Sequence, residues 1–263
     1  MNQILHKLLF SISIMLLFQS IVGCNESITV NNKPQIPEQT IVSDSNLTIT
    51  EPTIQLINID PEPLEQSLID AGLSDINNLD HTILINLKYA STDNFMDTNI
   101  YGNLKHAYLQ PEVAKSLVDA QLYLKSIDSS LTLLIYDAVR PRSVQQFMWD
   151  YLDLPVSEKI KFVSNPKNGS IHNYGSAVDL TIANTEGIPL DMGAKYDEIG
   201  KIAYPRLEKH YLKLGELTQQ QINNRQLLRR VMKQAQFTGI STEWWHFNRY
   251  SRAKAKQLYE IVE

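Results

Sequence analysis

The sequence predicts an α+β fold in a single folded domain, residues 66–263. Segments with the composition of short strands and segments with helical spacing follow one another irregularly, without the strand–helix repeat of a parallel α/β protein. About 200 residues are enough for one domain with a sizeable core, and neither an internal repeat nor a second linker is visible. These observations indicate one mixed domain preceded by a segment of different character.

The expected strands and helices can be placed from residue patterns. Apolar and β-branched residues predict strands over residues 81–89, 131–136, 177–182 and 244–249. Helical spacing predicts helices over residues 111–127, 143–152, 218–236 and 251–262. Pro111 occupies a first-turn position that tolerates proline. Thr218 with Gln221 forms a capping-box pattern at the start of the third helix.

Residues 1–23 have the pattern of a bacterial signal peptide. Lys7 provides a short positive start, and residues 8–18 form an apolar run that is too short to span a membrane. Small residues then precede Cys24, the single cysteine of the chain, in a pattern that resembles a lipobox. Two or more acyl chains anchor a protein stably. We therefore expect a lipoprotein anchored through Cys24 and facing the periplasm or the cell exterior. The alternative is an ordinary cleaved signal peptide followed by an incidental cysteine.

Residues 24–65 have the composition of a disordered tether. Five prolines interrupt a segment rich in Ser, Thr, Asn and Glu that has little apolar periodicity. A flexible chain of this length spans roughly 35 Å. The segment carries seven acidic residues and one basic residue, and with Lys7 also set aside 22 residues of each sign remain on residues 66–263. Because the folded part shows neither a basic excess nor a basic stripe, we expect no nucleic-acid partner.

Two separated segments supply the residue types of a catalytic zinc site. Residues 170–179 contain His172 and Asp179, and residues 243–246 contain Glu243 and His246. Catalytic zinc needs three protein ligands of nitrogen or oxygen type and an open position for water. Asp179 lies between apolar strand residues, where an acid is buried only when it is paired or metal-bound. With Cys24 acylated no thiolate is available, so we expect zinc on His172, Asp179 and His246.

Glu243 is the carboxylate left over, and it suits a general base that acts beside the metal. Because Glu243 and His246 are three residues apart, a regular strand would point them to opposite faces. We therefore expect Glu243 at a bend or bulge just before the strand. Arg140 follows a buried apolar strand. It is either half of a structural salt bridge with Asp137 or a cation for the oxyanion that forms when a carbonyl is attacked.

These motifs resemble those of the zinc peptidases that include VanX-type D-alanyl-D-alanine dipeptidases and VanY-type D,D-carboxypeptidases. Further stretches at residues 87–95, 137–141 and 147–148 favour the VanX type. The resemblance implies an α+β fold with a central antiparallel sheet, flanking helices and a confined pocket. It also implies one zinc ion on the three expected ligands and Glu243 as base and proton shuttle. Arg140 would stabilise the tetrahedral intermediate, and Ser170 and Asp191 are candidates for binding the substrate's amino terminus.

The activity that the resemblance implies is zinc-dependent hydrolysis of D-alanyl-D-alanine, or a closely related small dipeptide, in cell-wall peptide metabolism. Two alternatives stay open: a D,D- or L,D-carboxypeptidase acting on peptidoglycan stem peptides, and a non-catalytic wall-binding module in which zinc is structural. The spare Glu243 argues against the second, because a structural site has no need of a base. Val139 departs from the family pattern, which has an aromatic there. The predicted export departs too, since the resistance-associated VanX enzymes work in the cytoplasm.

Overall fold

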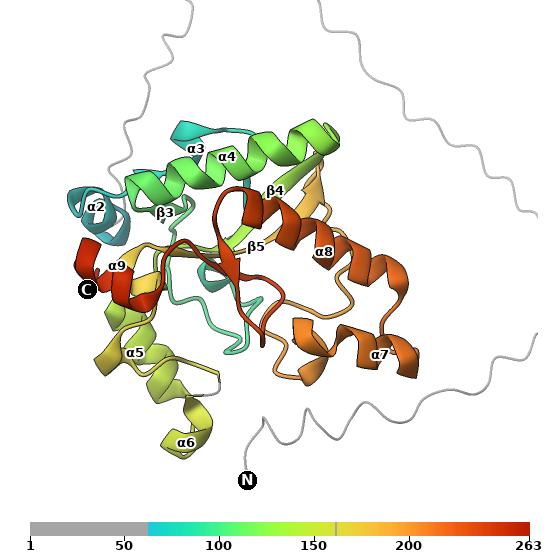
Figure 1. Cartoon of the computed structure of the whole chain (residues 1–263). Helices are drawn as coiled ribbons and strands as arrows, with labels where there is room; N and C mark the ends of the chain where they lie inside the picture. Colours follow the sequence, from blue (N-terminus) through green and yellow to red (C-terminus); the bar gives the residue numbers. More distant parts are fainter. Residues whose placement is uncertain (1–62, 161) are drawn as a thin grey trace, which may run out of the picture. The chain divides into compact units, whose positions relative to one another are not determined.

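The computed structural model describes residues 63–160 and 162–263. The predicted signal peptide, Cys24 and nearly all of the predicted tether lie outside these residues. Within them, no helix combines the length and the apolar composition that crossing a membrane requires. The described part is a mixed α and β structure in which a sheet is flanked by helices (Figure 1), as the sequence predicts.

A five-stranded sheet with the order β2–β4–β5–β7–β6 forms the core of the fold. Its strands are β2 (Leu84–Ile85), β4 (Leu131–Asp137), β5 (Ala177–Asn184), β7 (His246–Asn248) and β6 (Thr238–Gly239). Neighbouring strands are antiparallel except β2 and β4, which are parallel. A second, two-stranded sheet pairs β1 (Ser74–Asp75) with β3 (Tyr108–Leu109). β4 and β5 are buried almost throughout, so the core is built around them.

Two long helices cover one side of this sheet. α4 (Pro111–Ile127) contacts β4, α8 (Gln219–Gln234) contacts β5, and the two helices contact each other (Figure 1). α4 buries apolar residues at the spacing of one helical face, namely Val113, Ala114, Leu117, Ala120 and Leu124. α8 begins at the predicted capping box. The backbone N–H of Gln221 donates to the Thr218 hydroxyl, and the backbone N–H of Thr218 donates to Gln221 Oε1.

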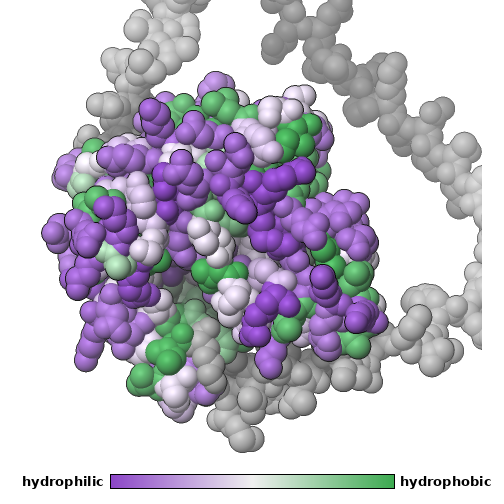
Figure 2. Space-filling model, viewed as in Figure 1, coloured by the Kyte–Doolittle hydropathy of each residue, from purple (hydrophilic) through white to green (hydrophobic). Residues whose placement is uncertain are grey.

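The remaining helices are short. They are α2 (Pro63–Asp70), α3 (Ile76–Leu79), α5 (Arg142–Tyr151), α6 (Val156–Lys159), α7 (Glu208–Leu214) and α9 (Arg252–Leu258), with 3-10 turns at Lys88–Ala90, Pro166–Asn168, His172–Tyr174, Lys201–Ala203 and Pro205–Leu207. α5 and α6 expose the apolar side chains of Phe147, Tyr151 and Val156. Figure 2 shows apolar groups in this part of a face that is otherwise mainly hydrophilic.

Most predicted elements are present with shifted ends. The helix over residues 111–127 has the predicted bounds. The strand predicted over residues 81–89 shortens to Leu84–Ile85, because residues 88–90 turn into a 3-10 helix. The strand predicted over residues 244–249 shortens to His246–Asn248, because bends precede it. The last helix ends at Leu258, since the Val262 backbone bonds to Arg142 and Asn173 and keeps the final residues extended.

The register of the sheet brings three polar residues into one row. Asp137 of β4 lies opposite Asp179 of β5, and Asp179 lies opposite His246 of β7. Directly opposed residues of neighbouring strands point to the same face of a sheet. A register shift between Ile135 and Asp137 ends the regular ladder of β4 at this point. The chain therefore leaves β4 beside Asp179, which brings Arg140 close to the same row.

Candidate metal centre

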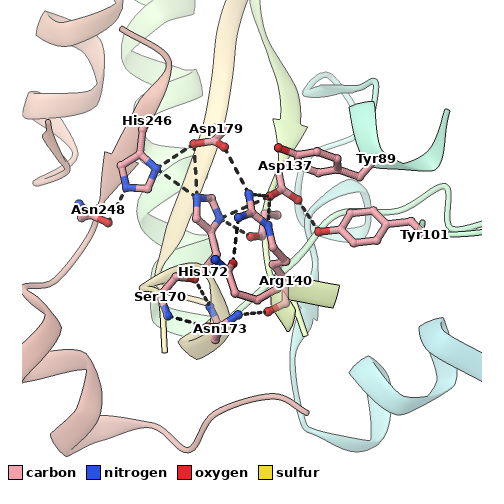
Figure 3. A network of polar contacts seen from close by, with 12 residues as sticks. Tyr89, Tyr101, Asp137, Arg140, Ser170, His172, Asn173, Asp179, His246 and Asn248 are labelled. Atoms are coloured by element: carbon pink, nitrogen blue, oxygen red, sulfur yellow. Dashed lines mark hydrogen bonds and ion pairs between the residues drawn. The ribbon is translucent and has the colours of Figure 1, made fainter. Parts of the chain in front are cut away.

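Three side chains converge at this row to form a group of metal-ligand type (Figure 3). They are His172, from the 3-10 turn before β5, Asp179 of β5 and His246 of β7. Asp179 Oδ1 lies 2.9 Å from His246 Nδ1 and 3.3 Å from His172 Nε2, and the two nitrogens are 3.1 Å apart. In a tetrahedral zinc site with bonds of about 2.0–2.1 Å, neighbouring donors are about 3.3 Å apart. The spacing of the three donors therefore fits one zinc ion.

Hydrogen bonds behind the donors orient them for a metal. His172 Nδ1 lies 2.6 Å from the Ala138 carbonyl oxygen, and His246 Nε2 lies 2.9 Å from Asn248 Oδ1. Because both acceptors are oxygens, these nitrogens carry the protons, and the other nitrogen of each ring presents its lone pair to the metal position. Tyr196 donates its hydroxyl to Asp179 Oδ2 at 3.0 Å, which leaves Oδ1 to face the two imidazoles.

The charges inside the group favour an ionised aspartate. Burial opposes the ionisation of Asp179, but the charge and hydrogen bonds of His172 and His246 hold the pKa of that carboxyl well below its usual range. Burial opposes the charge of His246 as well, yet its hydrogen bond to Asp179 raises its pKa to about 9. A metal ion at this position therefore competes with a proton on His246.

Glu243 stands beside the three donors without being one of them. It precedes β7 in a bent segment, which is the position that the sequence predicts. Its Oε2 atom lies 3.9 Å from His246 Nδ1, and its side chain is partly exposed. Burial raises the pKa of its carboxyl above the usual value, although the positive charge of His246 partly offsets this effect. A carboxylate so placed is able to accept a proton next to a metal and return it.

Arg140 is held by a structural ion pair and also lies beside the metal position. Its Nε and Nη2 atoms donate to Asp137 Oδ2 at 3.0 and 2.5 Å, and its Nη1 atom donates to Gln145 at 3.0 Å. The Tyr101 hydroxyl donates to the other Asp137 oxygen at 2.7 Å. These bonds use three of the five guanidinium N–H groups. Arg140 Nη2 lies 3.8 Å from Asp179 Oδ2, so both sequence interpretations of Arg140 are compatible with the geometry.

The buried amide of Asn173 ties the loop of His172 to Arg140 (Figure 3). Its Nδ2 atom donates to the Arg140 carbonyl at 2.6 Å, and its Oδ1 atom accepts from the Ser170 amide at 2.6 Å. The Arg140 amide in turn donates to the His172 carbonyl at 3.2 Å. A shift of the segment that carries Arg140 therefore moves the segment that carries His172, and the reverse. The sequence gives no signal for this role, because an Asn between His and Tyr matches no motif.

A cavity of about 340 Å³ opens over the metal centre. The three donors, Glu243 and Arg140 line it, together with apolar side chains that include Phe95, Met148, Val163 and Tyr204. Ser170, which the sequence places near the substrate, is buried in its wall. Asp191 does not line the cavity. Its exposed carboxylate instead accepts from the Gly193 amide and the Gln221 side chain, both at 2.8 Å.

The structure brings a different acid, Asp197, into the cavity. The Tyr89 hydroxyl bonds to its two oxygens at 3.1 and 3.3 Å. Burial, followed by the negative charge of Asp179, raises the pKa of Asp197 to about 8. Its backbone has a φ of 58°, in the left-handed region that non-glycine residues rarely adopt. Sequence reasoning missed Asp197 because the surrounding loop has no periodicity, and neither the turn nor the inward direction is visible in residue types.

Comparison with known proteins places the chain in a family. Residues 69–262 match Peptidase_M15, described as D-ala-D-ala dipeptidase. A D-alanyl-D-alanine dipeptidase of Escherichia coli is 37% identical over 166 residues, covering 62% of this chain and 77% of the relative. A D-alanyl-D-alanine dipeptidase of Synechocystis sp. is 30% identical over 168 residues, covering 53% and 68%. The chain belongs to the Peptidase_M15 family and is a zinc metallopeptidase.

The family match confirms the resemblance that the motifs predict. Zinc is the cofactor of this family, and the donor set of His172, Asp179 and His246 is suited to hold it. A solved structure of a VanY D,D-pentapeptidase variant from a VanB-type vancomycin-resistance cassette, in complex with Zn(II), is 15% identical. It covers 58% of this chain and 79% of that chain with a TM-score of 0.30, a likeness too weak to bear on the fold.

Proposed function

We propose that this chain hydrolyses D-alanyl-D-alanine, or a closely related small dipeptide, to free amino acids. The observation that carries the proposal is the cavity of about 340 Å³ in which Asp197 accompanies the metal centre. Such a volume suits a small ligand that is mostly enclosed. The relatives at 37% and 30% identity are D-alanyl-D-alanine dipeptidases, which supports the same substrate here.

Asp197 is the group that we assign to the free amine of the substrate. A carboxylate removed from water is stabilised in its charged form by a neighbouring positive charge. The hydroxyl of Tyr89, its hydrogen-bond partner, is neutral, so the ammonium of a dipeptide adds the charge that favours ionised Asp197. An acylated or longer substrate has no ammonium at that position. It leaves the partly buried carboxylate of Asp197 without a positively charged partner, and a site of this kind rejects such a substrate strongly.

Glu243 is the proton carrier in the proposed reaction. Zinc, when bound, lowers the pKa of its water and polarises the substrate carbonyl. Glu243 accepts the proton of the attacking water, since its carboxylate stands beside the metal ligands and burial raises its pKa above the usual value. The same carboxyl then returns the proton to the nitrogen of the departing amino acid. The C–N bond breaks, and the water oxygen remains on the carboxylate product.

Arg140 stabilises the negative charge that develops on the carbonyl oxygen. Asp137 and Gln145 hold its guanidinium, and the two N–H groups that they do not use are available to the substrate. A preorganised donor of this kind contributes about 10²–10³ in kcat. Ser170, in the wall of the cavity, offers its hydroxyl to one end of the dipeptide.

Four substrates test the proposal on the zinc-loaded protein: D-Ala-D-Ala, L-Ala-L-Ala, N-acetyl-D-Ala-D-Ala and a stem pentapeptide. We expect alanine release from the free D,D-dipeptide at a far higher kcat/KM than from the other three substrates. Glu243→Gln should retain zinc while kcat falls by about 10²–10⁴. Glu216→Gln, which changes an exposed glutamate outside the cavity, serves as the matched control. Full turnover by Glu243→Gln at equal zinc content would remove Glu243 from the proposed role.

A carboxypeptidase acting on stem peptides is the second candidate. A groove of about 750 Å³ shares Ser164 and Arg252 with the lining of the cavity, so a longer peptide has a path beyond it. Faster release of terminal D-alanine from the pentapeptide than from the dipeptide would move the function to a D,D- or L,D-carboxypeptidase. Full zinc content without turnover of any of the four substrates would favour a wall-binding module.

We also propose that the chain is exported and anchored to a membrane through Cys24. Three features of the sequence support this localisation: the apolar run of residues 8–18, the small residues before Cys24 and the proline-rich segment after it. Cys24→Ala should move the protein from the membrane fraction to the soluble fraction of cells that express it. Recovery of the wild-type protein, with Cys24 unchanged, in the soluble fraction would contradict the lipid anchor.

A further inference from the structure

Arg225 of α8 is a fully buried cation that has no step in the proposed reaction. A guanidinium is rarely removed from water unless its N–H groups are bonded. Arg225 Nε donates to the Met192 carbonyl at 2.6 Å and Nη1 donates to the Ile202 carbonyl at 3.0 Å, while the buried Nη2 has no hydrogen-bond partner among the described residues. Glu208 lies 3.8 Å from Arg225, but it accepts two bonds from Arg229 at 2.7 and 2.8 Å. The hydrogen-bond partners of Arg225 are therefore two backbone carbonyls.

These carbonyls stand at the two ends of one loop, residues 193–201, which we name the clasp loop. α8 also holds the entrance of the clasp loop, because Asn224 donates to the Asp191 carbonyl at 2.8 Å. Gly193 packs so closely on α8 that an added Cβ would lie 2.8 Å from Gln221 Oε1. The middle of the clasp loop is more exposed, with Lys195 among its exposed side chains. Its path therefore depends on how its ends are held.

Two neighbouring side chains connect the clasp loop to the candidate site. Tyr196 donates its hydroxyl to Asp179, a metal-ligand candidate, at 3.0 Å. Asp197, next to it, accepts from Tyr89 at 3.1 Å and lines the cavity. The φ of 58° at Asp197 is one that a non-glycine residue keeps only where its surroundings hold it. A loop with free ends would relax this turn and move the carboxylate.

We propose that Arg225 is the positioning residue of the amine-recognition side of the cavity: by joining Met192 to Ile202 it holds Asp197 at the place where a free dipeptide presents its ammonium. The inference rests on the role proposed for Asp197. A guanidinium suits this task because its planar N–H groups diverge and bond two carbonyls from separate segments at once. A lysine has a single nitrogen at its tip and would favour one carbonyl over the other.

Arg225→Met tests the proposal, with Arg225→Lys as a milder variant and Arg230→Met as the matched control. Arg230 lies on the same helix and is exposed. In zinc-loaded protein, Arg225→Met should raise KM for D-Ala-D-Ala by about tenfold or more while kcat changes less than about threefold. Its weak kcat/KM for N-acetyl-D-Ala-D-Ala should stay near the wild-type value, because that substrate offers no ammonium. Arg230→Met should match the wild type on both substrates.

Limited digestion with trypsin tests the clasp loop without using activity. Lys195 and Lys201 are exposed cleavage sites within it. Arg225→Met should be cut at these two sites faster than the wild type and Arg230→Met, as identified by mass spectrometry of the fragments. If Arg225→Met does not fold, Arg225→Lys takes its place, with a smaller change expected in both measurements.

Two results would overturn the proposal. The first is a folded, zinc-loaded Arg225→Met with wild-type KM and wild-type digestion. The second is faster digestion with unchanged KM, which would separate the clasp loop from substrate recognition. If the wild type fails to cleave the free dipeptide, the proposed function fails by itself, and the digestion rates still decide whether Arg225 holds the loop.

Discussion

Replacing Asn248 by leucine should weaken zinc binding without abolishing it. Asn248 Oδ1 accepts the proton of His246 Nε2 at 2.9 Å and so keeps Nδ1 free for the metal. Loss of such a partner typically costs about 10–100-fold in metal affinity, or about 1.4–2.7 kcal/mol. The His246 side chain is 13% exposed, so water is able to replace part of the lost bond. We therefore expect the lower end, a loss of about tenfold.

Competition with a chromophoric chelator at neutral pH measures the effect, and kcat is compared at saturating zinc. Asn248→Asp keeps the acceptor and adds negative charge, so it should bind zinc at least as tightly as the wild type. Asn223→Leu, an exposed change on α8, serves as the matched control. A folded Asn248→Leu with wild-type zinc affinity would refute the role of Asn248 in orienting His246.

Further predictions concern stability. Asp137→Leu should destabilise the fold by about 3–5 kcal/mol in thermal or denaturant unfolding, because it leaves Arg140 buried without its partner. Burial raises the pKa of Asp197 from 3.8 to about 8, so between these pH values the native metal-free protein binds more protons than the unfolded chain, and its stability falls as pH rises. Asp197→Asn should remove this contribution to the pH dependence of stability. If the unfolding free energies of the two proteins change in parallel from about pH 4 to about pH 8, the prediction is contradicted. Zinc at about 100 times its Kd should stabilise the wild type by about 2.7 kcal/mol, and a chelator should reverse the gain in Tm. An unchanged Tm would contradict the donor set.

The metal-ligand candidates could be predicted from sequence because their neighbours restrict what they do. An acid between Val178 and Leu180 on a buried strand needs a charged or metallic partner, and the structure places Asp179 opposite His246. The position of Glu243 before β7 also followed from strand geometry. Glu243 and His246 are three positions apart, and a regular strand would point their side chains to opposite faces.

Asp197 could not be predicted, because its direction depends on tertiary contacts and not on its neighbours in sequence. Its φ of 58° and the carbonyl bonds of Arg225 at both ends of the loop have no counterpart in residue periodicity. Asp191, which the resemblance suggested for the substrate's amino terminus, instead bonds to Gln221 at the surface. The short strands β1, β3 and β6 escaped prediction for a related reason: two residues are too few for a period to show.

The pairing of Asp179 with His246 also bears on how the chain assembles. The two residues are 67 positions apart, and β7 meets β5 at only three positions. An ion held by both strands closes this long loop as a cross-link does. With one cysteine, the chain cannot form a disulfide within itself. When zinc is scarce, we therefore expect slow folding and proteolysis of the C-terminal part first. A loss of activity per folded molecule should follow only later.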